Sequence, residues 1–291
     1  MENQKDDILM KERSSRACIS AGYRLYTGNF KRIFRYSWVA ALIYAVACSI
    51  GGTFMVLRPQ TTLLALVIVI IAEALFTAYG FAILKQHQQT GTINWPTKWF
   101  NLDTHIFVRT LKACLNQLVI YILVGVLIGG IGYVAIKYLS LYTGLACIGA
   151  ACLLAIILLL PLVYIVTRYI LTDGIGFWRQ LSIGYPVGMR HWGFIFIVIL
   201  IATLIVLAIS TFTALPATIL SLANVQATKS MMMGDPNGMP SYVGWLAAAT
   251  YFLIGFIQAY VQLSLLFPVY YMYGSIDAQE KAKQDFNKNQ Q

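Results

Sequence analysis

Long apolar runs separated by short polar segments dominate the hydropathy pattern of this chain. The run 61–84 is typical, because Glu73 is its only charged residue. Roughly 20 apolar residues cross the hydrocarbon core of a bilayer as a helix. Six runs of this kind occur, at about 38–57, 61–84, 113–136, 141–167, 193–222 and 241–273. The pattern therefore predicts an all-α integral membrane protein with six transmembrane helices.

The segment 14–36, ahead of the first run, has an amphipathic pattern instead. Its apolar residues recur at steps of 4, 3, 4 and 3 and so share one helical face: Ile19, Tyr23, Tyr26, Phe30 and Ile33. Basic residues occupy the other faces. Such a helix is expected to lie in the membrane interface with its apolar face toward the acyl chains. The alternative is a cytosolic helix packed against the spans. Gly28-Asn29 is expected to bend the segment before the first span.

The same pattern divides the chain into one membrane domain and two tails. Residues 1–13 form a polar N-terminal tail, residues 14–273 form the membrane domain, and residues 274–291 form a polar, charged tail. The short link at 58–60 forces the first two spans into an antiparallel hairpin. The fifth apolar run is longer than the hydrocarbon core is thick, so tilt or a break near Pro216 is expected.

The positions of the basic residues predict the orientation. Eighteen of the 21 Lys and Arg residues lie on the side of the termini, and only Arg58, Lys137 and Lys229 lie on the other side. Because Lys and Arg are retained on the cytoplasmic side of membrane proteins, both termini should be cytoplasmic. The expected location is therefore the inner (cytoplasmic) membrane.

Composition supports the membrane class and excludes others. Hydrophobic residues make up 59% of the 291 residues and charged residues 11%, whereas soluble domains carry about 25% charged residues. The net charge of +10 does not indicate a nucleic acid partner, because the basic residues flank the apolar runs. The five cysteines are scattered and the three histidines lie far apart. No metal site, cofactor or disulfide framework is expected.

Two pairs of short segments indicate an internal repeat. Residues 19–23 match residues 181–185, and each precedes an odd-numbered span. Residues 160–164 in the fourth span likewise match residues 267–271 in the sixth. The economical interpretation is three copies of an interfacial segment followed by a transmembrane hairpin, at about 14–84, 98–167 and 175–273.

The stretch 155–205 also carries a family resemblance. It contains PLVY at 161–164, RYILTDG at 168–174 and RHWG at 190–193. These residues resemble the signature of a broad group of bacterial six-span proteins. That group is similar to the membrane domain found ahead of some glycerophosphodiester phosphodiesterase catalytic domains. The resemblance implies the fold, and the activity is not expected to carry over, because these 291 residues leave no room for the soluble catalytic domain and contain no carboxylate cluster for the metal chemistry.

Glu73 is the strongest candidate for chemistry. An ionisable group in mid-membrane is costly and often marks an ion or substrate pathway. The alternative is a protonated carboxyl that hydrogen-bonds across a helix interface among small residues. Nearby amides and hydroxyls could line the same site or simply join helices. The candidate intramembrane polar site comprises Glu73, Thr77, Asn116, Gln258 and Gln262.

Two functions fit these observations. The first is a non-enzymatic scaffold, assembly partner or lipid-organising protein, which would bind membrane lipids, other proteins or a second copy of the chain. Its contacts with anionic head groups would come from Arg24, Lys31, Arg32 and Arg35. The alternative is a small permease or proton-coupled transporter with Glu73 as its titrating group. The sequence contains no P-loop, nucleophile elbow or dinucleotide fingerprint, so no enzymatic activity is expected.

Overall fold

The computed structural model describes residues 9–57, 62–94, 103–138, 140–234, 240 and 242–289. Helices joined by short links make up these ranges, and no strand occurs within them. The helices in chain order are α1 (Ser15–Gly28), α2 (Phe30–Leu57), α3 (Thr62–Thr90), α4 (Thr104–Tyr138), α5 (Leu141–Leu159), α6 (Pro161–Leu171), α7 (Phe177–Arg190), α8 (Trp192–Met232) and α9 (Val243–Asn289).

The six predicted spans are confirmed. α2, α3, α4, α8, α9 and the continuous run of α5 and α6 are each long and apolar enough to cross a membrane. Many of their large apolar side chains are exposed, and Leu63 is 80% exposed. Such a surface is stable in hydrocarbon and not in water. The all-α, six-span membrane fold expected from hydropathy is therefore the fold of the chain.

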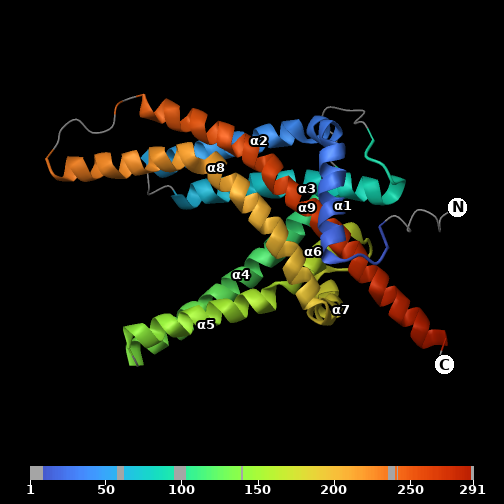
Figure 1. Cartoon of the computed structure of the whole chain (residues 1–291). Helices are drawn as coiled ribbons and strands as arrows, with labels where there is room; N and C mark the ends of the chain where they lie inside the picture. The colour runs from blue at the N-terminus through green and yellow to red at the C-terminus, as the bar shows by residue number, and fades with distance from the viewer. Residues whose placement is uncertain are drawn as a thin grey trace.

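Several helices continue past the apolar runs that predicted them. α3 extends to Thr90, and α9 extends to Asn289. At 1.5 Å per residue the 47 residues of α9 span about 70 Å, roughly twice the hydrocarbon thickness. The segment from 274 onward, expected as a polar tail, is thus helical as far as residue 289, and its last part projects beyond the other helices (Figure 1).

The two prolines of the fourth and fifth spans act differently. α5 ends at Leu159 and α6 begins at Pro161, so this proline starts a new helix within the fourth span. Pro216 lies inside α8, which stays helical throughout, so no break occurs there. Figure 1 shows α8 bending about midway along its length. A proline removes one backbone hydrogen bond and bends a helix without ending it.

The first helix crosses the spans. α1 ends at Gly28 and α2 begins at Phe30, and Figure 1 shows them running in different directions, so the expected bend is present. The apolar face of α1 packs largely on α9: Tyr26 is 8% exposed, and its hydroxyl donates to the carbonyl of Tyr260 at 2.9 Å. Protein contact therefore replaces much of the lipid contact expected for this face.

Gly22 makes this packing possible. A Cβ atom at Gly22 would lie 2.5 Å from the nitrogen of Pro268 on α9. α7 makes a similar contact, because a Cβ at Gly188 would lie 2.8 Å from the Cβ of Pro161 at the start of α6. Pro161 and Pro268 are equivalent in the matching segments, but the glycines are not, because Gly22 corresponds to Gly184 and not to Gly188. In each contact, a glycine of a crossing helix lies against a proline of a returning span.

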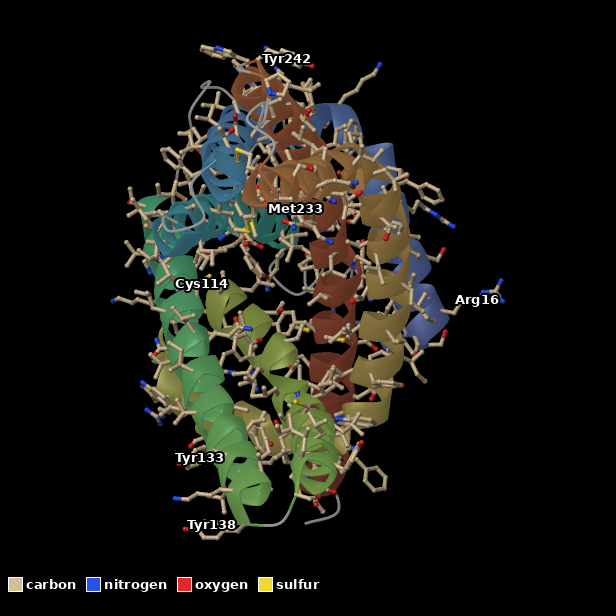
Figure 2. All side chains as sticks on the ribbon, turned by 90° about the vertical axis from the view of Figure 1, so that its left-hand side faces the viewer. Arg16, Cys114, Tyr133, Tyr138, Met233 and Tyr242 are labelled. Atoms are coloured by element: carbon tan, nitrogen blue, oxygen red, sulfur yellow. The ribbon has the colours of Figure 1, made fainter. Side chains whose placement is uncertain are left out.

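The buried core lies at the end of the spans where α1, α6 and α7 are found, here called the α1 end. Its largest fully buried side chains include Tyr79, Tyr164, Phe267, Tyr270 and Tyr273. At the opposite end the helices separate into two groups. Figure 2 labels Tyr138 at the tip of the α4–α5 hairpin, far from Tyr242 at the beginning of α9.

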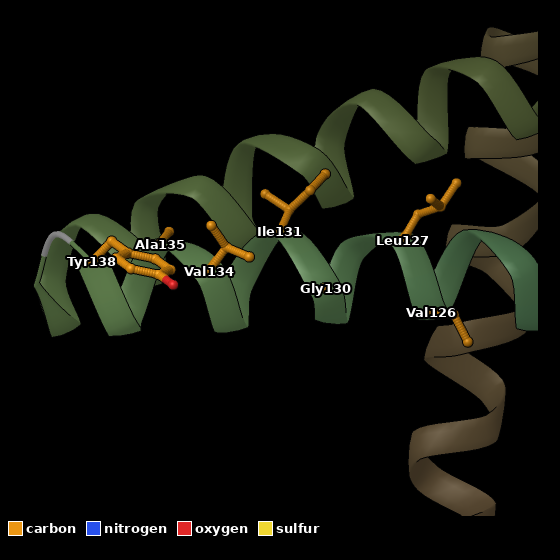
Figure 3. A pocket seen from close by; sticks show the side chains of 7 residues that line it. All are labelled: Val126, Leu127, Gly130, Ile131, Val134, Ala135 and Tyr138. Carbon is orange, nitrogen blue, oxygen red and sulfur yellow. The ribbon is translucent and has the colours of Figure 1, made fainter.

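The α4–α5 hairpin is the most exposed part of this arrangement. In the most apolar stretch of α4 only 11% of residues are buried, against 39% in α3. An apolar groove of about 520 Å³ follows the outer part of α4, with Val126, Gly130 and Tyr138 among its lining residues (Figure 3). The hairpin therefore contacts mainly the surrounding hydrocarbon, while the other spans contact one another.

Candidate functional site

Glu73 is exposed on the surface of α3. Its carboxyl lies close enough to Tyr44, Cys48 and Cys114 to interact electrostatically with each of them. It therefore sits where α2, α3 and α4 approach one another. Within the described ranges, neither a hydrogen bond nor an ion pair joins this carboxyl to another side chain. The expected polar residue in mid-span is thus present, and it faces outward.

Gln262 lies near Glu73, because its side chain interacts with the hydroxyl of Tyr44. Like Glu73 it is exposed, whereas Tyr44 is 5% exposed. One buried tyrosine of α2 thus lies between an exposed carboxyl of α3 and an exposed amide of α9. Thr77, one helical turn from Glu73, is half-buried.

Gln258 joins two helices. Its Oε1 accepts a hydrogen bond of 2.9 Å from the hydroxyl of Ser210, and its Nε2 donates to the hydroxyl of Thr213 at 3.2 Å. Both partners lie on α8. Asn116 donates to the carbonyl of Lys112 within α4 at 2.7 Å. Gln258 thus makes the interhelical bonds expected of an amide that joins membrane helices, whereas the bond of Asn116 stays within α4.

The four basic residues predicted to contact lipid differ in their surroundings. Arg24, Lys31 and Arg35 are exposed on α1 and the first turns of α2. Arg32 is half-buried and donates to the carbonyl of Ile93 at 3.0 Å, which ties the beginning of α2 to the segment after α3. Three of the four side chains are thus exposed, and Arg32 has a structural bond.

A polar pocket of about 760 Å³ lies beside α1. Lys11, Arg13 and Arg24 line it, with Glu12 as the one acidic side chain among its lining residues. The Arg13 guanidinium donates to the carbonyl of Leu9 at 2.9 Å. The pocket has an excess of positive charge at a surface, which suits an anionic group.

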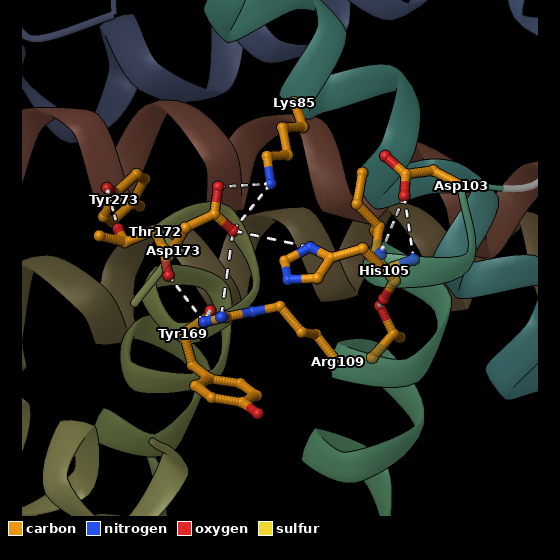
Figure 4. A network of polar contacts seen from close by, with 10 residues as sticks. Lys85, Asp103, His105, Arg109, Tyr169, Thr172, Asp173 and Tyr273 are labelled. Carbon is orange, nitrogen blue, oxygen red and sulfur yellow. Dashed lines mark hydrogen bonds and ion pairs between the residues drawn. The ribbon is translucent and has the colours of Figure 1, made fainter. Parts of the chain in front are cut away.

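Asp173 is the centre of an ion-pair network that sequence reasoning missed (Figure 4). Lys85 Nζ donates to both carboxylate oxygens at 2.9 Å. Nδ1 of His105 lies 3.8 Å from the carboxylate, and Nη1 of Arg109 lies 3.9 Å from it. The Arg109 guanidinium also donates to the carbonyls of Tyr169 and Thr172. The network therefore links α3 and α4 to the segment between α6 and α7.

These cations change the acidity of Asp173. The hydrogen bond from Lys85 is the main cause that holds the pKa of Asp173 below its usual value. Partial burial opposes this effect, and the charges of Lys85, Arg109 and His105 add to it. The carboxylate is therefore ionised at neutral pH. A charge count by segment could have identified the pair, because Lys85 directly follows the run 61–84 and Asp173 lies six positions after the run 141–167.

Two further acidic residues bind the C-terminal part of α9 to the rest of the chain. Asp277 accepts a hydrogen bond of 2.6 Å from the hydroxyl of Tyr164. Glu280 lies 3.0 Å from Nε2 of His191 and 3.2 Å from Nη1 of Arg190, at the junction of α7 and α8. These contacts hold the extended end of α9 against α6, α7 and α8.

The described residues include no group of three or more His, Cys, Asp or Glu side chains that could hold a metal ion. The five cysteines are free thiols. The polar groups of the α1 end are paired mainly with one another in ion pairs that connect helices.

Fold and site together define a class, a six-span all-α integral membrane protein. No protein-family model, curated protein or solved structure matches the chain. The resemblance of residues 155–205 to the phosphodiesterase membrane domain therefore stays a prediction.

Proposed function

We propose that the protein is a non-enzymatic inner-membrane protein that binds anionic lipid on its cytoplasmic side and serves as a scaffold for other membrane components. One observation carries this proposal. Arg24, Lys31 and Arg35 are exposed at the α1 end, the end that holds most of the 21 Lys and Arg residues of the chain. By the positive-inside rule this end faces the cytoplasm, where anionic head groups attract basic side chains.

The pocket beside α1 supports the same proposal. It lies next to the helix that crosses the spans, and Arg24 lines it together with Lys11 and Arg13. A phosphate group is a compact anion that accepts several hydrogen bonds from Arg and Lys. The head group of an anionic phospholipid would fit such a surface, with its acyl chains beside the apolar spans.

Lipid titration tests the proposal. The protein in detergent is titrated with fluorescent phosphatidylglycerol and, separately, with fluorescent phosphatidylcholine. Each basic residue near a membrane surface contributes about 1 kcal/mol, so replacing Arg24, Lys31 and Arg35 by Gln should weaken phosphatidylglycerol binding on the order of 100-fold. Phosphatidylcholine binding should not change.

A matched control removes the same charge elsewhere. Lys281, Lys283 and Lys288 are exposed near the end of α9, and their replacement by Gln should leave phosphatidylglycerol binding near the wild-type value. Equal losses in the two triple variants would mean that net charge alone attracts the lipid. No loss in either would refute the lipid-binding role of α1.

The alternative function is a proton-coupled permease. The exposure of Glu73 beside Tyr44 and Gln262 favours it, since polar groups from three helices approach one another within the spans. Proteoliposomes with an internal pH-sensitive dye would measure proton flux, which Glu73→Gln should abolish. Flux that is unchanged in this variant, or absent from the wild type, would argue against transport through Glu73.

A further inference from the structure

The position of Glu73 poses a physical problem. It is the eleventh residue after Thr62, the beginning of α3, so it lies roughly 16 Å along the helix and near the middle of the hydrocarbon core. Its side chain is exposed. A carboxyl group that faces hydrocarbon is costly, and membrane proteins generally pair such groups with a cation or a polar partner.

The chain does not supply that cation from its spans. None of the six apolar runs contains Lys, Arg or His, and the basic side chains nearest in sequence on α3, Lys85 and His87, contact Asp173 and Tyr270. A second copy of the chain would therefore present no basic group at this depth either. A basic partner for Glu73 at this depth would therefore have to belong to a different molecule.

The surface around Glu73 has the form of a helix-packing face. Leu63, Leu66, Ile70 and Glu73 follow one another at steps of 3, 4 and 3 and are all exposed. This spacing places them on one side of α3, in the seam pattern through which helices pack side by side. We call these four residues the α3 seam.

We propose that the α3 seam binds a transmembrane helix of a different protein that carries a lysine or arginine near its middle. The basic side chain pairs with Glu73, and the three apolar residues pack along the partner helix. The inference rests on the assembly role proposed above and names the kind of partner that such a scaffold would hold. It does not depend on the lipid contacts of α1.

A defined peptide tests the seam directly. The wild-type protein is reconstituted in phosphatidylcholine nanodiscs with a synthetic Leu-Ala transmembrane helix that has one central lysine. Association is measured by energy transfer between a dye on the peptide and a dye on a cysteine placed at Lys288. The comparison peptide has glutamine in place of the lysine. The lysine helix should bind roughly tenfold more tightly, as expected for one close charge pair.

Variants assign the effect to Glu73. Glu73→Gln keeps the size and polarity of the side chain, and it should abolish the preference for the lysine helix. Gln262→Leu, which changes the other exposed polar residue near Tyr44, should retain the preference. In the reverse experiment, Glu73→Lys should prefer a helix with a central glutamate.

The outcomes are distinct. Equal binding of the lysine and glutamine helices to the wild type would overturn the inference, as would a preference that persists in Glu73→Gln. Self-association of the protein that Glu73→Gln removes, without any preference for the lysine helix, would assign the seam to a second copy instead. The Arg24, Lys31, Arg35 triple variant should bind the lysine helix normally, so failure of the lipid proposal and failure of this one can be told apart.

Discussion

The contact between α1 and α9 offers the sharpest test of the fold. In Gly22→Ala the new Cβ would lie 2.5 Å from the nitrogen of Pro268 and 2.7 Å from the carbonyl carbon of Phe267. Both are backbone atoms, so the helices have to move apart. Overpacking of this kind costs about 1–3 kcal/mol, and the better helix propensity of alanine returns at most ~1 kcal/mol. Detachment of α1 should therefore become easier by about 1–2 kcal/mol.

Cys18 reports this detachment. Cys18 lies on the side of α1 that faces α9. Its side chain is fully buried, and its thiol approaches the carbonyl of Tyr271 at 3.6 Å. Burial raises the pKa of the Cys18 thiol to about 11, against smaller opposing effects of Arg13 and Ser275. Since the thiolate is the reactive form, labelling at neutral pH requires α1 to open.

Maleimide labelling measures the effect in a chain whose other four cysteines are replaced by alanine. Gly22→Ala should raise the labelling rate roughly five- to thirtyfold, which is the change in opening equilibrium that 1–2 kcal/mol produces. Gly28→Ala is the control, because nothing lies within 4 Å of a Cβ at that position. Unchanged labelling in Gly22→Ala, or the same increase in Gly28→Ala, would refute the packing of α1 on α9.

Three further predictions concern the links between helices. Asp173→Asn should lower the free energy of unfolding by about 1 kcal/mol, because it weakens the bond to Lys85 at a carboxylate that is 56% exposed. Since the pKa of Asp173 is lowered from its usual 3.8, this contribution is present above that value and is lost as the pH falls through the lowered pKa. Thermal unfolding from pH 7 to pH 3 should therefore show a smaller acid-dependent loss in the variant. Gln258→Leu should destabilise the α8–α9 contact by about 1 kcal/mol, measured by unfolding in detergent, and full wild-type stability would show that its bonds contribute nothing. Gly188→Ala should destabilise the α6–α7 contact by about 1 kcal/mol, because its Cβ would lie 2.8 Å from the Cβ of Pro161, and an unchanged melting temperature would contradict that contact.

Hydropathy predicted the spans because one physical requirement sets them. A helix has to be apolar over the thickness of the bilayer, and this requirement acts on local sequence alone. The proline in the fourth span was a weaker signal: Pro161 begins a helix, whereas Pro216 lies within one. Which outcome occurs depends on the neighbouring helices, which local sequence does not describe.

The surroundings of α1 could not be predicted from its pattern. An apolar helical face looks the same whether acyl chains or another helix cover it. Gly22 decides between them, because it lets the backbone of α1 approach α9. In the sequence, however, Gly22 is a single glycine in a helix, and its contact with Pro268 spans most of the chain.

The candidate polar site was only partly accessible to sequence reasoning. The rarity of charge in the spans identified Glu73, but not the exposure of its side chain. The bond between Lys85 and Asp173 joins residues that are 88 positions apart, and it forms only when the segment after α6 folds back against α3. Such pairs depend on tertiary packing, so a single sequence cannot identify them without contact information.

The predicted internal repeat can be compared with the pattern of burial. The matching segments 19–23 and 181–185 differ by 162 positions, and at that offset Ile33 corresponds to Ile195 and Ala40 to Ala202. All four side chains are at most 1% exposed. At the same offset, however, buried Ala41 and Ala45 correspond to Thr203 and Leu207, which are exposed. Burial therefore agrees with the repeat at some positions of α2 and α8, and the repeat stays a prediction.

The crossing helices α1 and α7 each pack on a hairpin other than the one that follows them in the chain. α7, ahead of the third hairpin, lies with Gly188 against Pro161 in the second, and α1, ahead of the first hairpin, lies with Gly22 against Pro268 in the third. α7 therefore packs on the returning span of the hairpin before it, and α1 packs on the returning span of the last hairpin. Leu9 packs against Gly274, so the first described residues of the chain also contact α9. The position of a crossing helix in this fold is thus determined by another hairpin and not by its own hairpin.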